Sequence, residues 1–380
     1  VTTGIQNTLI GGLAGDAFTD ADHNVAVGLN ALSADTQGSK STAIGTGALA
    51  TQNFTSATNT YNTAVGYDAG VAVTTGTLNT LIGGLAGDAI TTGAANVAVG
   101  YRSLSATTTA SSNTAIGVDA LTSNTTGTSN TAVGRDTLNQ QTTASYNTAL
   151  GHQALNLNTS GANNTASGYR ALYANTTAAN NVAVGYYALL ANTTGDRNTA
   201  VGSGAADSLT TGAANTALGY KAMDAHTTGN SNTAVGAYAL DANTTAGDNT
   251  AVGSSALTTN TTGASNTAVG TGALDANTTA SNNTAVGANA LAANTTGEQN
   301  TSVGVISMDA NTTGSYNSSI GYNSLGANTT GVRNSALGYS ALGANTTGDF
   351  NVAVGMYSLD ANTTGNVNVA LGYQALSSAT

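Results

Sequence analysis

The sequence predicts an all-β protein, a parallel β-solenoid (β-roll) of 22 coils with 17 residues per coil. Two observations lead to this fold class: one motif recurs every 17 residues, and each copy has a glycine at the same place. Seventeen residues are too few for a helix-turn-helix unit, and the glycine would cost a helix about 1 kcal/mol per copy. Two short strands and two tight corners fit this length, with coils stacked about 4.8 Å apart through backbone hydrogen bonds.

The repeat is clearest in the stretch NTAVGTGALDANTTASN, residues 266–282. With Asn266 as position 0, nineteen copies starting from 62 to 368 follow one another without insertion or deletion, and three more start at 7, 24 and 41. Four extra residues enter within about 53–61. The consensus is N-T-A-V-G-Y-x-A-L-x-A-N-T-T-G-x-x. We therefore expect residues 1–380 to form a single continuous repeat domain.

Positions 1–3 predict one strand of each coil, and positions 7–10 predict a second. Side chains alternate between the two faces of a strand, so we expect the aliphatic residue at position 3 and the leucine at position 8 to fill a thin interior. The alanine at position 2 would then face outward, and its small size predicts a closely packed partner subunit. The asparagines at positions 0 and 11 are expected to stack into ladders bonded to turn backbone.

The glycine at position 4 is present in every copy and ends the first predicted strand. We interpret it as a corner residue, with a positive φ or a backbone too close to its neighbour for a Cβ atom. Its spacing forms no phosphate-binding loop. The structural corner residues predicted in this way are Gly11, Gly28, Gly45, Gly66, Gly83, Gly100, Gly117, Gly134, Gly236, Gly253 and Gly270.

A few copies depart from the consensus at position 8. The stretch NTLIGGLAGDA occurs at 7–17 and again at 79–89, which indicates a segmental duplication. Gly15 and Gly87 stand there in place of the leucine, and Ala206 marks a similar variant.

Composition argues against several classes of partner. Charged residues make up 7% of the chain, the net charge is −11, and there are only seven Lys and Arg. Nucleic acids and anionic lipids need clustered cations, so neither is an expected partner. No stretch approaches 18 unbroken apolar residues, so we expect no membrane insertion. The absence of cysteine excludes disulfides and thiolate metal sites and leaves the compartment open.

The sequence gives little sign of catalytic or metal chemistry. His23, His152 and His226 fall at positions 16, 5 and 11, so they cannot stack into a metal ladder. No His–Asp partnership accompanies the abundant Ser and Thr, which argues against a hydrolase triad. Aspartates recur at position 9, where a calcium site would need several converging oxygens; we expect a solvated edge that opposes lateral aggregation. These aspartates are Asp224, Asp241, Asp275, Asp309 and Asp360. We expect no enzyme, no cofactor and no metal.

Two surface rows suggest ligands as alternatives. Stacked threonines of NTTG could bind ice, but adjacent threonines point to opposite faces, so a corner ladder is the preferred interpretation. The NTT triplets also match N-glycosylation sequons, although an asparagine held in a ladder could not be modified. Exposed tyrosines at position 5 would favour glycan binding. These candidates are Tyr101, Tyr169, Tyr186, Tyr220 and Tyr339.

The combination of NTAVG with A-L and NTTG resembles the head repeats of YadA-like trimeric autotransporter adhesins. It is more closely similar to the NTAVGYQAL…NTTG repeats of phage tail fibres and related surface proteins, which are often followed by a self-cleaving endosialidase-type chaperone. The resemblance covers essentially the whole chain. It implies a left-handed β-roll assembled as a homotrimer. The adhesin heads have a shorter repeat, with Val or Ile where this chain has Thr at position 1.

The function that the resemblance implies is a non-enzymatic structural rod in an extracellular fibre. The rod would be a tail-fibre shaft of a virion or a cell-adhesion segment at a cell surface. A receptor or cell-surface glycan would be bound through domains outside this chain. Twenty-two coils at about 4.8 Å predict a length of roughly 100 Å. Val1 falls at position 11 and Thr380 at position 12, so the termini are expected near one corner, and end-to-end stacking into a filament is the alternative.

Overall fold

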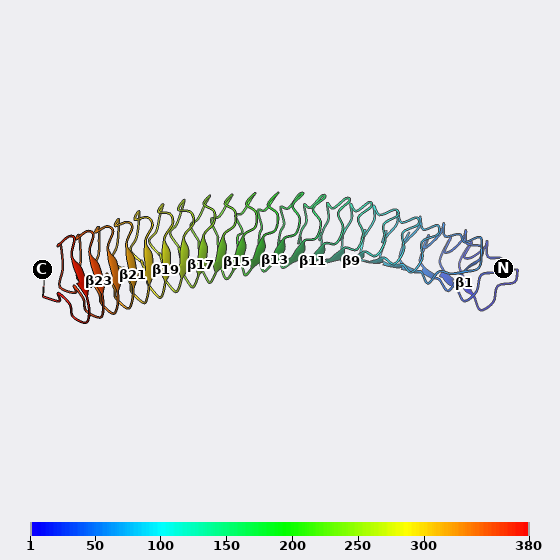
Figure 1. Cartoon of the computed structure of the whole chain (residues 1–380). Coiled ribbons are helices and arrows are strands. Elements are labelled where there is room, and N and C mark those ends of the chain that lie inside the picture. Colours follow the sequence, from blue (N-terminus) through cyan, green and yellow to red (C-terminus); the bar gives the residue numbers. More distant parts are fainter. Residues whose placement is uncertain (1, 379–380) are drawn as a thin grey trace. The chain divides into compact units, whose positions relative to one another are not determined.

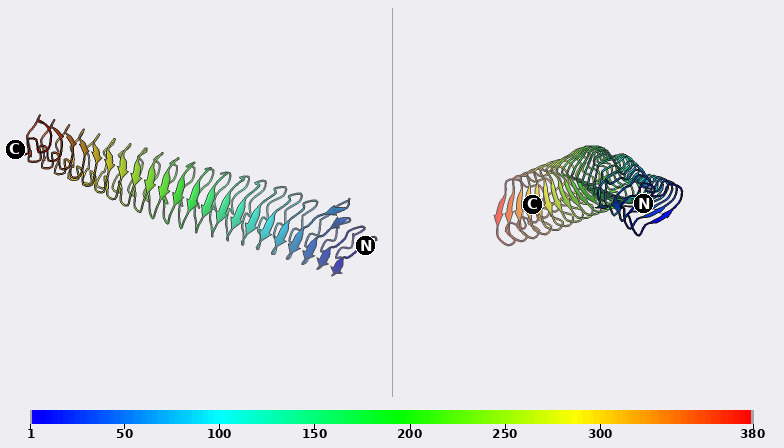
Figure 2. Two further views of the ribbon diagram at one scale, coloured as in Figure 1. Left: turned by 60° about the horizontal axis from the view of Figure 1, so that its bottom comes forward. Right: turned by 90° about the vertical axis from the view of Figure 1, so that its right-hand side faces the viewer.

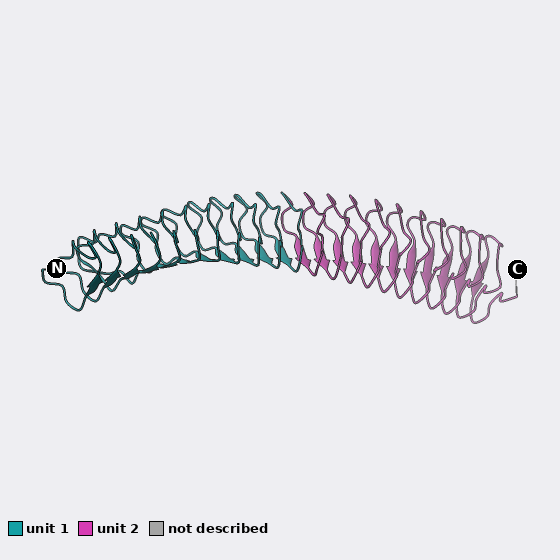
Figure 3. Ribbon diagram, turned by 180° about the vertical axis from the view of Figure 1, so that it is seen from behind, with its two compact units in different colours: residues 1–194 teal, residues 195–380 magenta. Residues whose placement is uncertain are grey.

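A computed structural model describes residues 2–378, and these residues contain strands but no α-helix. The chain divides into two compact units, unit 1 (Val1–Thr194) and unit 2 (Gly195–Thr380), coloured separately in Figure 3. Each unit is a parallel β-solenoid. The predicted fold class is therefore confirmed, whereas handedness, trimerisation, the rod length and the single continuous domain stay predictions. The expectation about the termini concerns Val1 and Thr380, which lie outside the described residues.

Each coil contributes one three-residue strand, formed by positions 1–3. In unit 1 these strands are β1 (Thr8–Ile10), β2 (Val25–Val27), β4 (Thr42–Ile44), β6 (Thr63–Val65), β7 (Thr80–Ile82), β8 (Val97–Val99), β9 (Thr114–Ile116), β10 (Thr131–Val133), β11 (Thr148–Leu150), β12 (Thr165–Ser167) and β13 (Val182–Val184). In unit 2 they are β14 (Thr199–Val201), β15 (Thr216–Leu218), β16 (Thr233–Val235), β17 (Thr250–Val252), β18 (Thr267–Val269), β19 (Thr284–Val286), β20 (Thr301–Val303), β21 (Ser318–Ile320), β22 (Ser335–Leu337), β23 (Val352–Val354) and β24 (Val369–Leu371).

Within each unit, consecutive strands lie side by side and parallel (Figure 1). Their register is one repeat, so Thr131 of β10 is opposite Thr148 of β11. The four-residue insertion lengthens the step from β4 to β6, where Thr42 is opposite Thr63. Beside the insertion, β3 (Gly38–Ser39) pairs with β5 (Thr58–Asn59).

The predicted second strand, at positions 7–10, is wrong. These residues form turns, with left-handed backbone at positions 6 and 8, as at Arg102 (φ 56°) and Leu104 (φ 55°). The two N–H groups point in opposite directions along the stack: Arg102 donates to the Gly84 carbonyl of the preceding coil (3.1 Å), and Leu104 donates to the Ala120 carbonyl of the next coil (3.1 Å). The corner thus bonds to both neighbouring coils without an extended strand, which compensates for the cost of left-handed non-glycine residues.

The predicted orientation of the strand is also wrong. The alanine at position 2 points inward and is fully buried, as at Ala132, whereas the aliphatic residue at position 3 points outward, as at Leu150, which is 40% exposed. The interior is filled from the opposite wall, where leucines at position 8 such as Leu138 are fully buried. Opposite a leucine at position 8 the interior has room for only a small side chain at position 2, whereas opposite Gly87 it holds the fully buried Leu81. Because side chains alternate, positions 1 and 3 share the outer face.

Where the leucine at position 8 is missing, an apolar side chain at position 11 replaces it. Gly87 is followed by Ile90, and a Cβ atom at Gly87 would lie 2.8 Å from Leu81 and 2.9 Å from Ile90. Gly15 is followed in the same way by Phe18. In these coils the large apolar side chain stands three residues later in the repeat than in the other coils, and the interior is still filled, as close packing requires.

The predicted asparagine ladders are confirmed. At position 0, the Asn147 backbone N–H donates to Oδ1 of Asn130 (2.9 Å) and its side chain donates to the Gly161 carbonyl (2.9 Å). At position 11, Nδ2 of Asn175 donates to Oδ1 of Asn158 (2.8 Å). These buried amides satisfy the turn carbonyls that the interior would otherwise leave without donors.

Candidate functional site

The most extensive unusual surface is the outer strand face, which we define as positions 1 and 3 of every coil. The left view of Figure 2 shows the strands of each unit along one wall of the coils. Position 1 is Thr, Val or Ser and position 3 is Val, Ile, Leu or Ser, so no charged side chain occurs on this face. Ile116 is 38% exposed and Leu337 is 48% exposed. Within each unit, an uncharged face with exposed aliphatic side chains is typical of an interaction surface.

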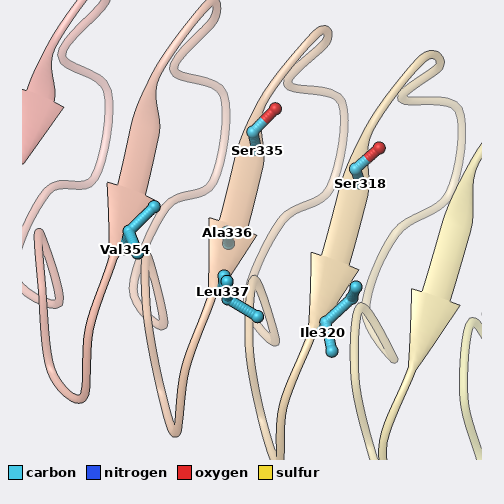
Figure 4. A pocket seen from close by; sticks show the side chains of 6 residues that line it. All are labelled: Ser318, Ile320, Ser335, Ala336, Leu337 and Val354. Atoms are coloured by element: carbon cyan, nitrogen blue, oxygen red, sulfur yellow. The ribbon is translucent and has the colours of Figure 1, made fainter. Parts of the chain in front are cut away.

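In unit 2 this face contains a hollow of about 240 Å³. Ser318 and Ser335 stand at position 1, where most copies have threonine, and they lack its methyl group. Figure 4 shows the two serine hydroxyls at one end of the hollow and the aliphatic side chains at the other. The lining residues are Ser318, Ile320, Ser335, Ala336, Leu337 and Val354.

The corner glycines form a second row, on which a ligand has no room. All eleven predicted positions have φ between 128° and 141°. A Cβ atom at Gly236 would lie 2.5 Å from the Gly253 carbonyl oxygen of the next coil. The close approach of consecutive backbones explains this row.

The tyrosines at position 5 mostly stack on one another. Tyr169 and Tyr186 have ring centroids 5.5 Å apart at 14°. Tyr339 stacks on Tyr322 at 5.1 Å and 15°. A sugar stacks on an open ring face, and in these pairs a neighbouring ring already covers one face.

The other two candidate tyrosines differ from this pattern. Tyr220 meets Tyr238 edge-on at 5.4 Å. Tyr101 is 52% exposed, and no ring contact of Tyr101 is found among residues 2–378. Tyr101 therefore presents the most open ring of the five.

Aspartates at position 9 of three successive coils, Asp207, Asp224 and Asp241, are half-buried rather than freely solvated. Burial, together with the neighbouring charge of Asp224, raises the pKa of Asp207 to about 6 and also raises the pKa of Asp241. Lys221 pairs with Asp224 at 3.1 Å. Burial likewise raises the pKa of Asp309. Negative charge is therefore disfavoured at Asp207 and Asp241, and Lys221 is the cation that pairs with Asp224 between them.

The three histidines lie in different surroundings. His23 is exposed, and His152 contacts the Tyr169 ring at 5.6 Å. His226 is fully buried. In the described part of the chain, no group of three His, Cys, Asp or Glu side chains is arranged to hold a metal ion.

Sequence reasoning missed two features of the molecule. It placed position 3 in the interior, so the outer strand face was not recognised. It also gave His226 no role, although its place at position 11, among asparagines, marks it as a member of the ladder.

No family model matches this sequence, and no curated protein is similar to it. Within residues 2–378, no helix is long and apolar enough to span a membrane. The fold and its surfaces define a class: a parallel β-solenoid repeat protein with an uncharged outer strand face.

Proposed function

We propose that the chain is a non-enzymatic structural shaft of an extracellular fibre, either a phage tail fibre or a surface adhesin, and that it assembles as a homotrimer. The observation that supports this most strongly is the outer strand face, which has no charged side chain in any coil and an aliphatic side chain at position 3 in every coil but the one with Ser167. Copies would associate through this face, not through the alanines at position 2, which are buried inside each coil.

A second copy of the same chain matches this face better than an unrelated partner. Rows of aliphatic side chains recur once per coil, about 4.8 Å apart, and another copy has the same spacing along its whole length. With no charge on the face, electrostatic complementarity gives no advantage to a charged partner. Symmetric self-association is also the commonest form of oligomer.

The test is mass in solution by light scattering, together with negative-stain images. We expect a trimer for the unaltered chain and loss of the trimer for Val269→Lys, which places a charge on the outer strand face. Thr279→Lys is the matched control, because Thr279 is exposed at a corner away from this face. A monomeric unaltered chain would contradict the proposal, and long polymers would favour the filament.

One observation favours a second candidate function, ice binding. Threonine stands at position 1 in seven consecutive coils of unit 2, from Thr199 to Thr301, and points outward. Binding to ice by a solenoid would require a regular, outward-facing row of threonine hydroxyl and methyl groups of this kind. Thermal hysteresis of a monomeric chain, abolished by Thr250→Lys, would favour this function over the shaft.

A further inference from the structure

His226 occupies position 11 of its coil, where the coils that follow it have asparagine. The ring is fully buried. Its Nε2 atom lies 2.9 Å from the Gly229 carbonyl oxygen, and its Nδ1 atom lies 3.0 Å from Nδ2 of Asn243 in the next coil. The ring therefore belongs to the interior ladder.

The two shorter contacts set the protonation state of the ring; a third and longer one joins Nε2 to Nδ2 of Asn232 at 3.4 Å. A carbonyl oxygen only accepts and an amide NH₂ only donates, so the ring is neutral, with its hydrogen on Nε2. This arrangement reproduces that of an asparagine: Nδ2 of Asn277 donates to the Ala280 carbonyl (3.0 Å), and its Oδ1 accepts from Asn294 (3.0 Å).

A second proton on the ring would lie on Nδ1, which faces the NH₂ group of Asn243 at 3.0 Å, so two donors would meet there. The Asn243 backbone offers this proton an acceptor. Turning the Asn243 amide would also offer its oxygen to the ring, but it would remove the hydrogen bond from Nδ2 to the Ala246 carbonyl (3.0 Å). Either arrangement leaves a positive charge fully buried, which disfavours the protonated ring.

No nearby charge offsets this cost. Burial is the main cause of the lowered pKa of His226, its hydrogen bonds to the backbone of Gly229 and of Asn243 act in the opposite direction, and no charged side chain contributes. The preceding coil has Leu209 at the same position of the repeat. The other titratable groups of the three coils around the ring lie at positions 5, 6, 9 and 16: Asp207, Tyr220, Lys221, Asp224, Tyr238, Asp241 and Asp248.

We propose that His226 makes its coil an acid-labile point of unit 2, where protonation opens the hydrogen bonds between this coil and the next. This inference does not depend on the proposed shaft function, because it concerns the coil interior and not the outer strand face. It assigns to one coil a pH response that the asparagine-containing coils lack.

The sign of the effect follows from the two states of the ring. In the opened coil the imidazole has a pKa of about 6.5, and in the closed coil its pKa is lower. The open state therefore takes up the proton first as the pH falls. Opening increases about tenfold per pH unit below 6.5, until the pKa of the closed coil is reached.

The neighbouring carboxylates act in the opposite direction. Asp207, with a pKa raised to about 6, takes up a proton in the same range and loses its repulsion with Asp224. A comparison of variants at fixed pH separates the contribution of His226 from that of the carboxylates.

The experiment is hydrogen exchange of the intact chain at pH 7.5 and pH 5.0, corrected for intrinsic exchange rates. In the unaltered chain, we expect protection to fall about tenfold or more at amides such as Thr227, which donates to the Thr244 carbonyl at 2.9 Å. His226→Asn restores the asparagine of the ladder and should abolish the fall. An equal fall in both proteins would overturn the proposal.

A transplanted histidine provides the second arm. Asn277→His, between Asn260 and Asn294, should create a new acid-labile coil with the same tenfold change. If the peptides around residue 277 keep their protection at pH 5.0 in this variant, a buried histidine in the ladder does not open a coil, and the proposal fails.

Discussion

Leu209 is fully buried three residues after the buried Ala206, and together they reverse the usual order of the interior. In twelve coils a leucine or methionine at position 8 precedes an asparagine at position 11. The solenoid therefore has two interchangeable ways to fill one coil: an apolar side chain at position 8 with an amide at position 11, or a small residue followed by an apolar one.

This exchange predicts a double-mutant cycle at Leu274 and Asn277, both fully buried. Leu274→Ala alone should cost about 2–5 kcal/mol through the cavity it creates. Asn277→Leu alone should cost about 2 kcal/mol or more, because Oδ1 of Asn260 and the Ala280 carbonyl lose their donor. The double variant reproduces the Ala206–Leu209 arrangement. We expect a favourable coupling of at least about 1 kcal/mol, measured by urea unfolding; additive losses would contradict it.

Gly236→Val should disrupt stacking between coils. Gly236 has a φ of 136° and approaches the Gly253 carbonyl oxygen, so valine adds both strain and a clash, at a cost of about 3 kcal/mol or more. Thermal unfolding by circular dichroism measures the loss. Asp241→Ser is the control and should be neutral or slightly stabilising, because burial and the charge of Asp224 already disfavour this carboxylate. Equal tolerance of both changes would rule out the close backbone approach.

Asp207→Asn should stabilise unit 2 at neutral pH. The folded-state pKa of Asp207, about 6, lies above the ordinary value of 3.8, so the unfolded state releases its proton first as the pH rises. The stability contributed by protonated Asp207 is lost between about pH 4 and 6 and stays lost above that range. Because the group is half exposed, solvent screening limits the gain to about 1 kcal/mol.

The measurement for Asp207→Asn is the unfolding midpoint at pH 4 and at pH 8. The gain should appear at pH 8 and vanish at pH 4. Asp275→Asn is the control. The residues at position 9 of the coils before and after Asp275 are Thr258 and Ala292, so no second carboxylate lies beside it. A gain of the same size at both pH values would show that charge repulsion is not its cause.

Tyr339→Ala should lower stability by about 1 kcal/mol, because the ring stacks on Tyr322 at 5.1 Å and meets the Tyr357 ring edge-on at 5.4 Å. Tyr101→Ala should have almost no effect on stability. Thermal midpoints of the two variants test the contrast. Equal losses would mean that ring stacking contributes little to this row.

The repeat, the parallel stacking and the asparagine ladders could be predicted because each follows from the spacing of identical residues. The direction of the short strand could not. A strand of three residues has only one side chain on one face and two on the other, so its alternation does not show which face is buried. Hydrophobicity alone favoured Val269 over Ala268 for the interior. In the structure Ala268 is buried and Val269 faces outward. The left-handed leucines at position 8, such as Leu104, leave no sign in composition. The link between Ala206 and Leu209 was visible in the sequence, but only when positions 8 and 11 are compared.

Each coil bonds only to the coil before it and the coil after it, through contacts one repeat of 17 residues apart, such as that of Asn294 with Asn277. Removing one whole repeat inside a unit brings together two coils that already carry matching partners. Unequal recombination between near-identical stretches of the gene can therefore shorten or lengthen the protein by whole coils without leaving a broken bond. The copies of NTLIGGLAGDA at 7–17 and 79–89 indicate that segments of this chain have been duplicated. The number of coils in the protein can therefore change during evolution by whole repeats, without a change in the residues that fill and bond any one coil.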